Sequence, residues 1–291
     1  AREQVLPIYQ QFDGLVSAIF VGSASRNLQG AYSDVDMVIY WEDRFPEDSI
    51  RQGAIETAGG VIGEIGDTSE GETDPALQSR GEAFYLYGDR HTGAKIDVTH
   101  KTIKSAERLI QDVVSRHTIN RIKLSIIHSM QRGITLYGET WMDGCREQIG
   151  QECPLEIADA LIRQNIKFNP IWVFDMFADR PDLILDLRYR LQLVEQMLMI
   201  LVGLNRLYPP HYFKHLNALI EELAIKPENL TSRIQQILQS EPANAKQVAF
   251  TLGDEVYDLL AQHRPAIEVG SAREFFHFPR PKHDQSPLVK G

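Results

Sequence analysis

The sequence has few of the features that mark secreted, membrane-spanning or metal-clustered proteins. It contains two cysteines, Cys145 and Cys153, and two such residues without clustered histidines favour neither a disulfide framework nor a zinc site. Its longest apolar run, Met197–Leu204, is far shorter than the ~18–20 residues of a membrane-spanning helix. The first residues show no apolar segment of the signal-peptide type. These absences predict a cytoplasmic protein that does not cross a membrane.

Basic residues are scarce in the first third of the chain. Residues 1–100 hold seven lysines and arginines against 17 aspartates and glutamates, so the whole formal charge of −10 arises there. Between Arg51 and Arg80 there is no basic residue, while six acidic residues accumulate. A surface of this sign repels nucleic acid and attracts cations. The pattern predicts either a site for a cationic ligand or a solvated acidic loop, and it disfavours a nucleic-acid partner.

Short apolar runs separated by turns predict strands in the first hundred residues. Residues 15–21 and 35–41 are rich in β-forming side chains, and the first of these runs ends at Gly22. Residues 83–87 and 94–99 are typical of a hairpin that encloses a glycine-containing turn. Together these runs predict a small mixed sheet.

From residue 103 onward, apolar residues recur at helical spacing. The predicted helices cover residues 103–116, 120–136, 155–168, 181–204, 211–222, 230–239 and 243–262. We therefore predict an α+β fold with two domains, a mixed-sheet domain over residues 1–115 and an all-helical domain over residues 116–275. The prolines of residues 276–291 predict an extended tail.

Three cues follow one another between the first two predicted strands. The first strand ends at Gly22 and Ser23, a pair typical of a tight turn. A helix of one or two turns over residues 23–28 would direct free N–H groups outward. Asp34 and Asp36 start the second strand, whose period of two puts both carboxylates on one face. Amide groups beside paired carboxylates suit a triphosphate that arrives with Mg²⁺, because the metal takes oxygen ligands from both.

This segment resembles the signature of the polymerase β-like nucleotidyltransferase superfamily, in which Gly-Ser is followed, after a short gap, by two acidic residues separated by an apolar one. Here ten residues separate Ser23 from Asp34. The extended form of the signature is matched by Arg26 and Ser33. Asn27 stands where many members have glycine.

The resemblance implies a transferase that moves a nucleoside monophosphate from ATP or another NTP to a hydroxyl group of an acceptor. Members usually carry a third carboxylate on a later strand. By this resemblance the catalytic and metal-binding residues, which would hold two Mg²⁺ ions, are Asp34, Asp36 and Asp97. The nucleotide-binding residues would be Gly22, Ser23, Arg26 and Ser33. Asp97 would either complete the metal site or accept the proton of the acceptor hydroxyl. Such chemistry depends mainly on positioning and charge neutralisation.

The two-domain organisation resembles that of bacterial aminoglycoside and lincosamide nucleotidyltransferases, in which a helical domain helps to form the acceptor pocket. This resemblance implies a small acceptor. Cationic antibiotics are among the candidates, and their modification would confer antibiotic resistance. It also implies a monomer or homodimer. Two alternatives stay open. One is an enzyme that modifies a protein or tRNA, as in toxin–antitoxin pairs, and the other is a nucleotide-binding regulator without turnover. The intact aspartates disfavour the regulator, and the acidic charge disfavours tRNA.

Several polar residues in the helical region have two alternative roles. In one they contact the nucleotide or the acceptor, and in the other they form hydrogen bonds between packed helices. They include Arg188, Asn205 and Arg206. Arg206 and His211 also match the spacing of helical ribonucleases, but the two prolines between them would break the required helix. His100, three residues after the third aspartate, is predicted to be structural.

Overall fold

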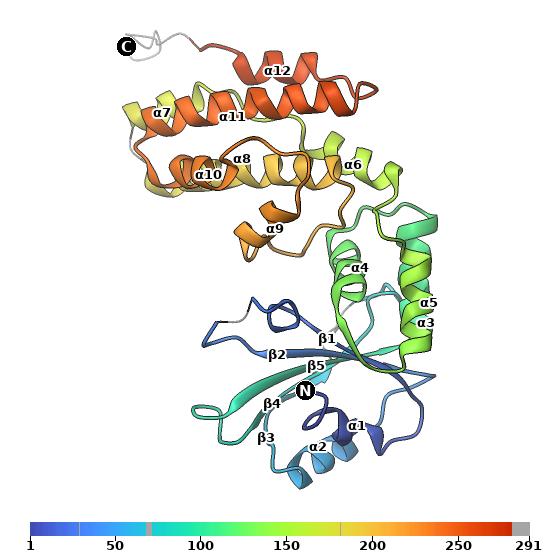
Figure 1. The fold of residues 1–291 in the computed structure, drawn as a ribbon. Coiled ribbons are helices and arrows are strands. Elements are labelled where there is room, and N and C mark those ends of the chain that lie inside the picture. The colour runs from blue at the N-terminus through green and yellow to red at the C-terminus, as the bar shows by residue number, and fades with distance from the viewer. Residues whose placement is uncertain (29, 68–71, 181, 281–291) are drawn as a thin grey trace, which may run out of the picture. The chain divides into compact units, whose positions relative to one another are not determined.

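The computed structural model describes residues 1–280 except residues 29, 68–71 and 181 (Figure 1). The chain divides into two compact units. The first consists of Ala1–Pro154 and Tyr208–His211, and the second of Leu155–Leu207 and Tyr212–Gly291. The first unit holds a mixed sheet with flanking helices, and the elements described in the second unit are helices. The predicted α+β fold class is confirmed.

One sheet in the first unit has the strand order β3-β4-β5-β2-β1-β6. Its strands are β1 (Leu15–Val21), β2 (Val35–Trp41), β3 (Val61–Asp67), β4 (Arg80–Leu86), β5 (Ala94–Thr102) and β6 (Ile134–Tyr137). β2 and β5 run parallel, and the other neighbouring strands run antiparallel. The bounds of β1 and β2 agree with the two predicted apolar runs, and β4 and β5 form the predicted hairpin.

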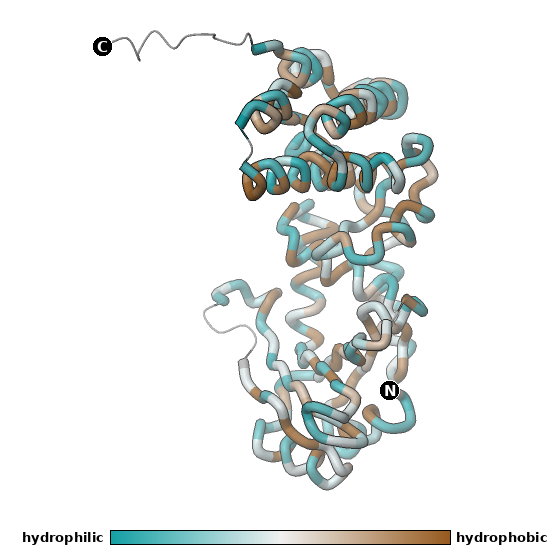
Figure 2. Tube along the Cα trace, turned by 90° about the vertical axis from the view of Figure 1, so that its left-hand side faces the viewer, coloured by the Kyte–Doolittle hydropathy of each residue, from teal (hydrophilic) through white to brown (hydrophobic). Residues whose placement is uncertain are grey.

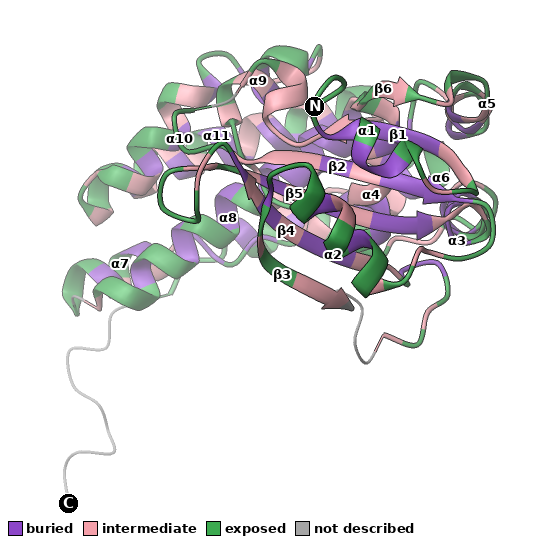
Figure 3. Ribbon diagram, turned by 90° about the horizontal axis from the view of Figure 1, so that it is seen from below, coloured by how far each residue is buried: buried purple, intermediate pink, exposed green. Residues whose placement is uncertain are grey.

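Helices flank both faces of this sheet (Figure 1). They are α1 (Leu6–Gln10), α2 (Asp48–Thr57), α3 (Ile103–Ile110), α4 (Arg121–Arg132) and α5 (Glu139–Ile149), and α3 continues into a π-helical turn, Gln111–Ser115. Figure 2 shows hydrophobic and hydrophilic residues interspersed along the chain. Met37, Ile39 and Trp41 of β2 belong to the apolar core that includes residues of α1 and α2. Because side chains alternate along a strand, the residues between them face the opposite side; Tyr40, for example, contacts Trp141 of α5 with ring centroids 4.9 Å apart. Figure 3 shows the central strands as largely buried.

A buried polar cluster joins α1 and α2 to the sheet. Glu82 on β4 accepts hydrogen bonds from the hydroxyl of Tyr9 and from Nε of Arg51, the latter at 2.8 Å. His100 on β5 has its Nε2 3.1 Å from the same carboxylate. The indole N–H of Trp41 donates to His100 Nδ1 at 3.0 Å, which assigns the imidazole proton to Nε2. Burial alone would raise the pKa of Glu82, but the hydrogen bonds it receives hold that pKa below its usual range. The structural role predicted for His100 is confirmed.

The second unit packs its helices around one apolar core. They are α6 (Leu155–Asn165), α7 (Val173–Asp179), α8 (Leu183–Leu204), α9 (Leu216–Glu222), α10 (Leu230–Gln239), α11 (Pro242–His263) and α12 (Gly270–His277). Leu201 of α8 and Leu252 of α11 are fully buried in this core. The guanidinium of buried Arg190 binds Asp186 with N–O distances of 2.6 and 2.5 Å. Within the described part of the chain, every helix is too short or too polar to cross a membrane.

A short strand replaces the end of one predicted helix. The sequence predicts a helix over residues 120–136, whereas α4 ends at Arg132. Gly133 adopts an extended conformation with φ −67° and ψ 154°, and the β-branched and aromatic side chains of Ile134–Tyr137 favour a strand. These residues form β6 by pairing with β1. Helical periodicity cannot reveal such a long-range partner, so the prediction was wrong at this point.

The division between the units lies further along the chain than the boundary predicted after residue 115. α4 and α5 pack against β1 and therefore belong to the first unit, which extends to Pro154. Of the predicted tail, residues 281–291 lie outside the described residues, and α12 ends at His277.

Candidate functional site

The three predicted aspartates lie near one end of two neighbouring strands. In the parallel register Asp36 of β2 is opposite Asp97 of β5. Asp34 directly precedes β2 and is two residues from Asp36, so the two side chains share a face. That face is opposite the one on which Met37 and Ile39 enter the core. The structure therefore brings the three carboxylates to one face of the sheet, as the alternation predicts.

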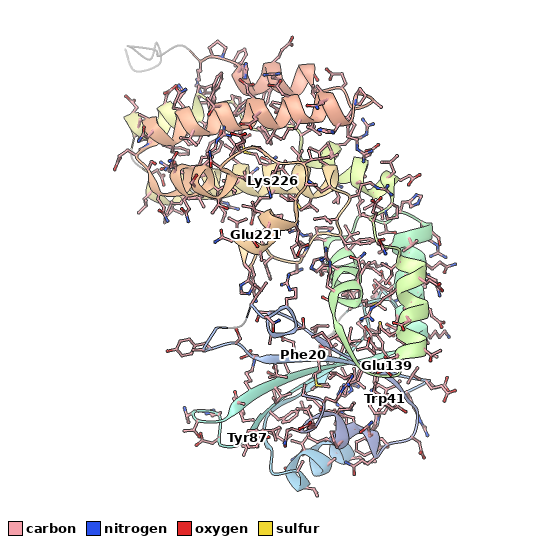
Figure 4. The ribbon with its side chains drawn as sticks, viewed as in Figure 1. Phe20, Trp41, Tyr87, Glu139, Glu221 and Lys226 are labelled. Carbon is pink, nitrogen blue, oxygen red and sulfur yellow. The ribbon has the colours of Figure 1, made fainter. Side chains whose placement is uncertain are left out.

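Gly22 fits closely against Asp36. β1 is antiparallel to β2 and pairs Val21 with Asp36, and Gly22 follows with a φ of +75°, a conformation that favours glycine. A Cβ atom on Gly22 would lie 2.0 Å from Oδ2 and 2.9 Å from Cγ of Asp36. Only glycine therefore lets this carboxylate lie against the turn. Phe20, labelled in Figure 4, marks the end of β1 from which the turn starts.

The turn after β1 is tighter than predicted. The sequence predicts one or two helical turns over residues 23–28, whereas the structure has a single 3₁₀ turn, Ala24–Arg26. The N–H groups of Arg26 and Leu28 both donate to the carbonyl of Ser23, at 3.2 and 3.0 Å, so these donors are used within the turn. A helix of three residues has only a small dipole. The turn is thus at the short end of the one or two turns predicted, and its dipole would contribute little to the binding of a phosphate.

Asn27 has a conformational reason for standing where many superfamily members have glycine. Its φ of 56° and ψ of 31° lie in the left-handed region, which glycine adopts freely and asparagine tolerates better than most residues. Asparagine is therefore compatible with the backbone conformation of this turn.

The two serines of the signature lie close to each other across the turn. Oγ of Ser23 is 3.4 Å from Oγ of Ser33, which also accepts a hydrogen bond from the N–H of Gly30 at 2.9 Å. Their hydroxyl groups therefore occupy one side of the turn that carries Gly22. Burial lowers the pKa of His128 on α4 to about 4, and the positive charge of Arg26, which lies on the same turn, adds to this lowering. The Arg26 guanidinium therefore lies within electrostatic range of α4.

Lys95 is a site residue that the sequence analysis did not identify. Its Nζ donates hydrogen bonds to Oδ2 of Asp97 at 2.7 Å and to Oδ2 of Asp34 at 3.0 Å. These bonds, with Asp97 the stronger contributor, raise the pKa of Lys95. Burial and the neighbouring Asp34 carboxylate raise the pKa of Asp97 above its usual range, against the opposing effect of Lys95. The available signal was the alternation of β5, which puts Lys95 and Asp97 on one face.

The carboxylates fit a divalent cation that brings further oxygen ligands with it. Among the residues that the structure describes, no group of three or more His, Cys, Asp or Glu side chains is arranged to hold a metal ion. Mg²⁺ is commonly bound by one or two carboxylates together with substrate phosphates and water. Asp34 and Asp97 already share one cationic group, the Lys95 ammonium, and Asp36 lies beside Asp97 in the register. This partial set of ligands suits Mg²⁺ that arrives with a nucleotide.

Asp74, in the acidic segment before β4, is engaged by a lysine. β4 begins at Arg80, which pairs with His100, three residues beyond Asp97 along β5. The carboxylate of Asp74 lies 2.6 Å from Nζ of Lys123, and hydrogen bonds, that of Lys123 foremost, hold the pKa of Asp74 below its usual range. Asp74 is thus part of a structural ion pair. Glu70, in the same segment, lies outside the described residues.

A surface hollow of about 1220 Å³ lies at the far end of the same strands. Its lining includes Asp43 and Phe45, which follow β2, and Thr102, which ends β5. Because β2 and β5 are parallel and the aspartates lie near their starts, the hollow and the aspartates are at opposite ends of these strands. The hollow is therefore not the aspartate site.

The polar residues predicted in the helical region differ in their surroundings. Asn205 caps a neighbouring segment, because its side chain donates to the carbonyl of Ile225 and accepts from the N–H of Ile225, each at 2.8 Å. This is the helix-packing role, one of the two alternatives for that residue. Arg188 is exposed on α8. α8 ends at Leu204, so Arg206 and His211 do not share a helix and the ribonuclease arrangement is absent.

No family model and no curated protein matches the chain. Among solved structures, the chain is similar to spectinomycin adenyltransferase AAD(9) from Enterococcus faecialis, determined with ATP and spectinomycin. The two are 13% identical, the match covers 87% of this chain and 96% of that chain, and the TM-score is 0.37.

Proposed function

We propose that this protein is a metal-dependent nucleotidyltransferase whose active site is formed by Asp34, Asp36 and Asp97 beside the Gly22 turn. The observation that carries the proposal is the close fit between Gly22 and the carboxylate of Asp36, which lies on the strand next to that of Asp97. A Cβ atom on Gly22 would lie 2.0 Å from Oδ2 of this carboxylate. A purely structural turn has no need to hold a carboxylate in this way. A site for a metal and a triphosphate needs both a carboxylate ligand and an unobstructed backbone.

Each site residue has a distinct task in the proposed reaction. Asp34 and Asp36 would hold Mg²⁺, and two such ions would supply activation of the attacking oxygen and stabilisation of the leaving group. Gly22 leaves room for the triphosphate of ATP at the backbone. The hydroxyl groups of Ser23 and Ser33 donate hydrogen bonds to phosphate oxygens, and Arg26 neutralises phosphate charge at the edge of the turn.

The proposed reaction is an in-line displacement at the α-phosphorus of ATP. The oxygen of an acceptor hydroxyl forms a bond to this phosphorus, and the bond between the phosphorus and the bridging oxygen to the β-phosphate breaks. Pyrophosphate leaves with that oxygen. The proton of the hydroxyl passes to a carboxylate oxygen of Asp97, or to water if Asp97 serves as a metal ligand. The protein contributes mainly by holding these groups in line.

The acceptor that fits best is a small molecule with hydroxyl groups and positive charge. The net charge of −10 arises within residues 1–100, and a negative field concentrates cations and repels anionic acceptors. Asp74 is engaged with Lys123, so the charge of the whole sheet domain, rather than an acidic loop, supports this choice. Aminoglycosides, lincosamides and spectinomycin, the compound found with AAD(9), form a suitable panel.

Calorimetric titration of ATP tests the nucleotide site without any acceptor. We expect the wild-type protein to bind ATP with Mg²⁺ and to lose most of this affinity in EDTA or after Asp34→Asn. Lys104→Gln, a change at an exposed residue of α3, should bind as the wild type does. ATP affinity that is equal with Mg²⁺ and with EDTA would contradict the proposal.

A further inference from the structure

The ammonium group of Lys95 joins two of the three site aspartates. Its Nζ lies 3.0 Å from Oδ2 of Asp34 and 2.7 Å from Oδ2 of Asp97. The register explains this position: Val35 is opposite Ile96, so the residues that precede them, Asp34 and Lys95, stand side by side. The three side chains are between 34% and 38% exposed. Ions and nucleotides can therefore reach the ion pairs from solvent.

Lys95 occupies one oxygen of Asp34 and one of Asp97, two of the four oxygens that these carboxylates offer to a metal. Mg²⁺ takes oxygen ligands at about 2.0–2.1 Å, whereas the ammonium lies at hydrogen-bonding distance from the same two oxygens. Two cations at such close range also repel each other strongly. A bare metal ion that binds between these carboxylates therefore competes with the Lys95 ammonium.

We propose that Lys95 is a resident counter-ion that makes metal binding depend on the nucleotide. Without nucleotide, its ammonium neutralises Asp34 and Asp97 and competes with bare Mg²⁺. When the metal arrives with a nucleotide, the triphosphate oxygens give the displaced ammonium new negative partners, and the competition is relieved. Lys95 is thus a positioning residue that couples the two affinities. This inference rests on the proposed function, because it requires a metal–nucleotide site at these carboxylates.

Titration with Mn²⁺, followed by the electron paramagnetic resonance of the free ion and corrected for the Mn²⁺ that ATP binds without protein, tests the coupling with and without ATP. Lys95→Gln removes the charge and keeps a side chain of similar length. We expect it to bind bare Mn²⁺ on the order of tenfold more tightly than the wild type, within the usual range of such couplings. ATP should then tighten Mn²⁺ binding by a smaller factor than in the wild type. Lys95→Arg, which keeps the charge, and Lys104→Gln, which removes a charge elsewhere, should keep the low affinity for the bare ion.

A second measurement uses the wild-type protein and does not depend on the folding of a variant. Acetylation of lysines, quantified for each residue by mass spectrometry, reports how freely an amine reacts. Saturating Mn²⁺ without ATP should raise the labelling of Lys95 relative to that of Lys104, because the ammonium is released from its carboxylates. Unchanged relative labelling of Lys95 with Mn²⁺ bound would contradict the inference.

The outcomes separate this inference from the proposed function. If Lys95→Gln is folded and binds bare Mn²⁺ no more tightly than the wild type, while ATP still strengthens Mn²⁺ binding in both, Lys95 is not the counter-ion and the proposed function stands. If the wild type binds no Mn²⁺ even with ATP present, both are overturned. Thermal unfolding in EDTA establishes that the variant is folded.

Discussion

A single methyl group on Gly22 should disable the proposed site through Asp36. In Gly22→Ala the new Cβ would lie 2.0 Å from Oδ2 and 2.9 Å from Cγ of Asp36, distances that no packed side chain tolerates. The carboxylate has to rotate away, because Gly22 directly follows Val21, which is paired with Asp36 itself. The variant therefore moves a proposed metal ligand without changing its chemistry.

Two costs of different origin follow from this change. Alanine at the φ of +75° found at Gly22 destabilises the fold by roughly 1–2 kcal/mol, which for a domain of this size lowers Tm by roughly 2–8 °C. Displacing the Asp36 carboxylate by about 1 Å or more is expected to lower kcat by about 10²-fold or more, as misplaced catalytic groups do. The loss of activity should thus greatly exceed what the loss of stability explains.

Gly14→Ala is the matched control. Gly14 has a φ of +84°, and a Cβ there would meet nothing within 4 Å, so this variant carries the backbone strain alone. Thermal unfolding and nucleotide transfer should be measured for both variants. We expect similar losses of Tm but a loss of activity only in Gly22→Ala. Wild-type turnover in Gly22→Ala, or an equal loss in Gly14→Ala, would refute the link between Gly22 and Asp36.

Four further predictions concern other charged groups. Asp34→Asn or Asp36→Asn should abolish transfer, and turnover within about threefold of the wild type would count against a metal role. The unfolding free energy should hold or rise slightly in Asp36→Asn, because repulsion between carboxylates is removed, whereas in Asp34→Asn the loss of the ion pair with Lys95 opposes that gain. Asp97→Asn should lower kcat by ~10²–10⁴-fold with ATP affinity kept if Asp97 is a base, and calorimetry will show that affinity fall if it is a metal ligand; an unchanged kcat excludes both. Glu82→Leu removes the buried carboxylate that pairs with the Arg51 guanidinium and leaves it only the partly exposed Asp48 as a counter-ion, so urea unfolding should reveal a loss of about 3 kcal/mol. Burial lowers the pKa of Lys101 to about 8, so Lys101→Met should stabilise the protein by about 2–3 kcal/mol below pH 8; this gain should fade as pH rises from about 8 towards 10.5, where the unfolded chain also loses its proton, and a gain independent of pH would contradict the burial argument.

The main features of the site could be predicted because they depend on local pattern. The apolar run of residues 15–21 ends at Gly22, and the next run begins at Asp34, so both ends of the motif are visible in the sequence. Strand alternation then puts Asp34 and Asp36 on one face. These predictions need no knowledge of which strands pair.

Features that depend on pairing between distant segments could not be predicted. The contact of Lys95 with Asp34 follows from the parallel register of β2 and β5, which the sequence pattern does not specify. β6 exists because β1 offers it a partner. The acidic segment gave a misleading signal at Asp74 for the same reason, since its counter-ion, Lys123, is far away in the sequence.

Transfer of the nucleotide itself tests the central claim most directly. The protein should be incubated with ATP labelled at the α-phosphate, Mg²⁺ and the cationic acceptor panel, with pyrophosphate release and the mass of the product followed together. We predict an acceptor heavier by one nucleoside monophosphate, formed in equal amount with pyrophosphate, and its loss in EDTA and in Asp36→Asn. Product formed at the wild-type rate by Asp36→Asn would contradict the claim, as would ATP turnover that releases phosphate without pyrophosphate.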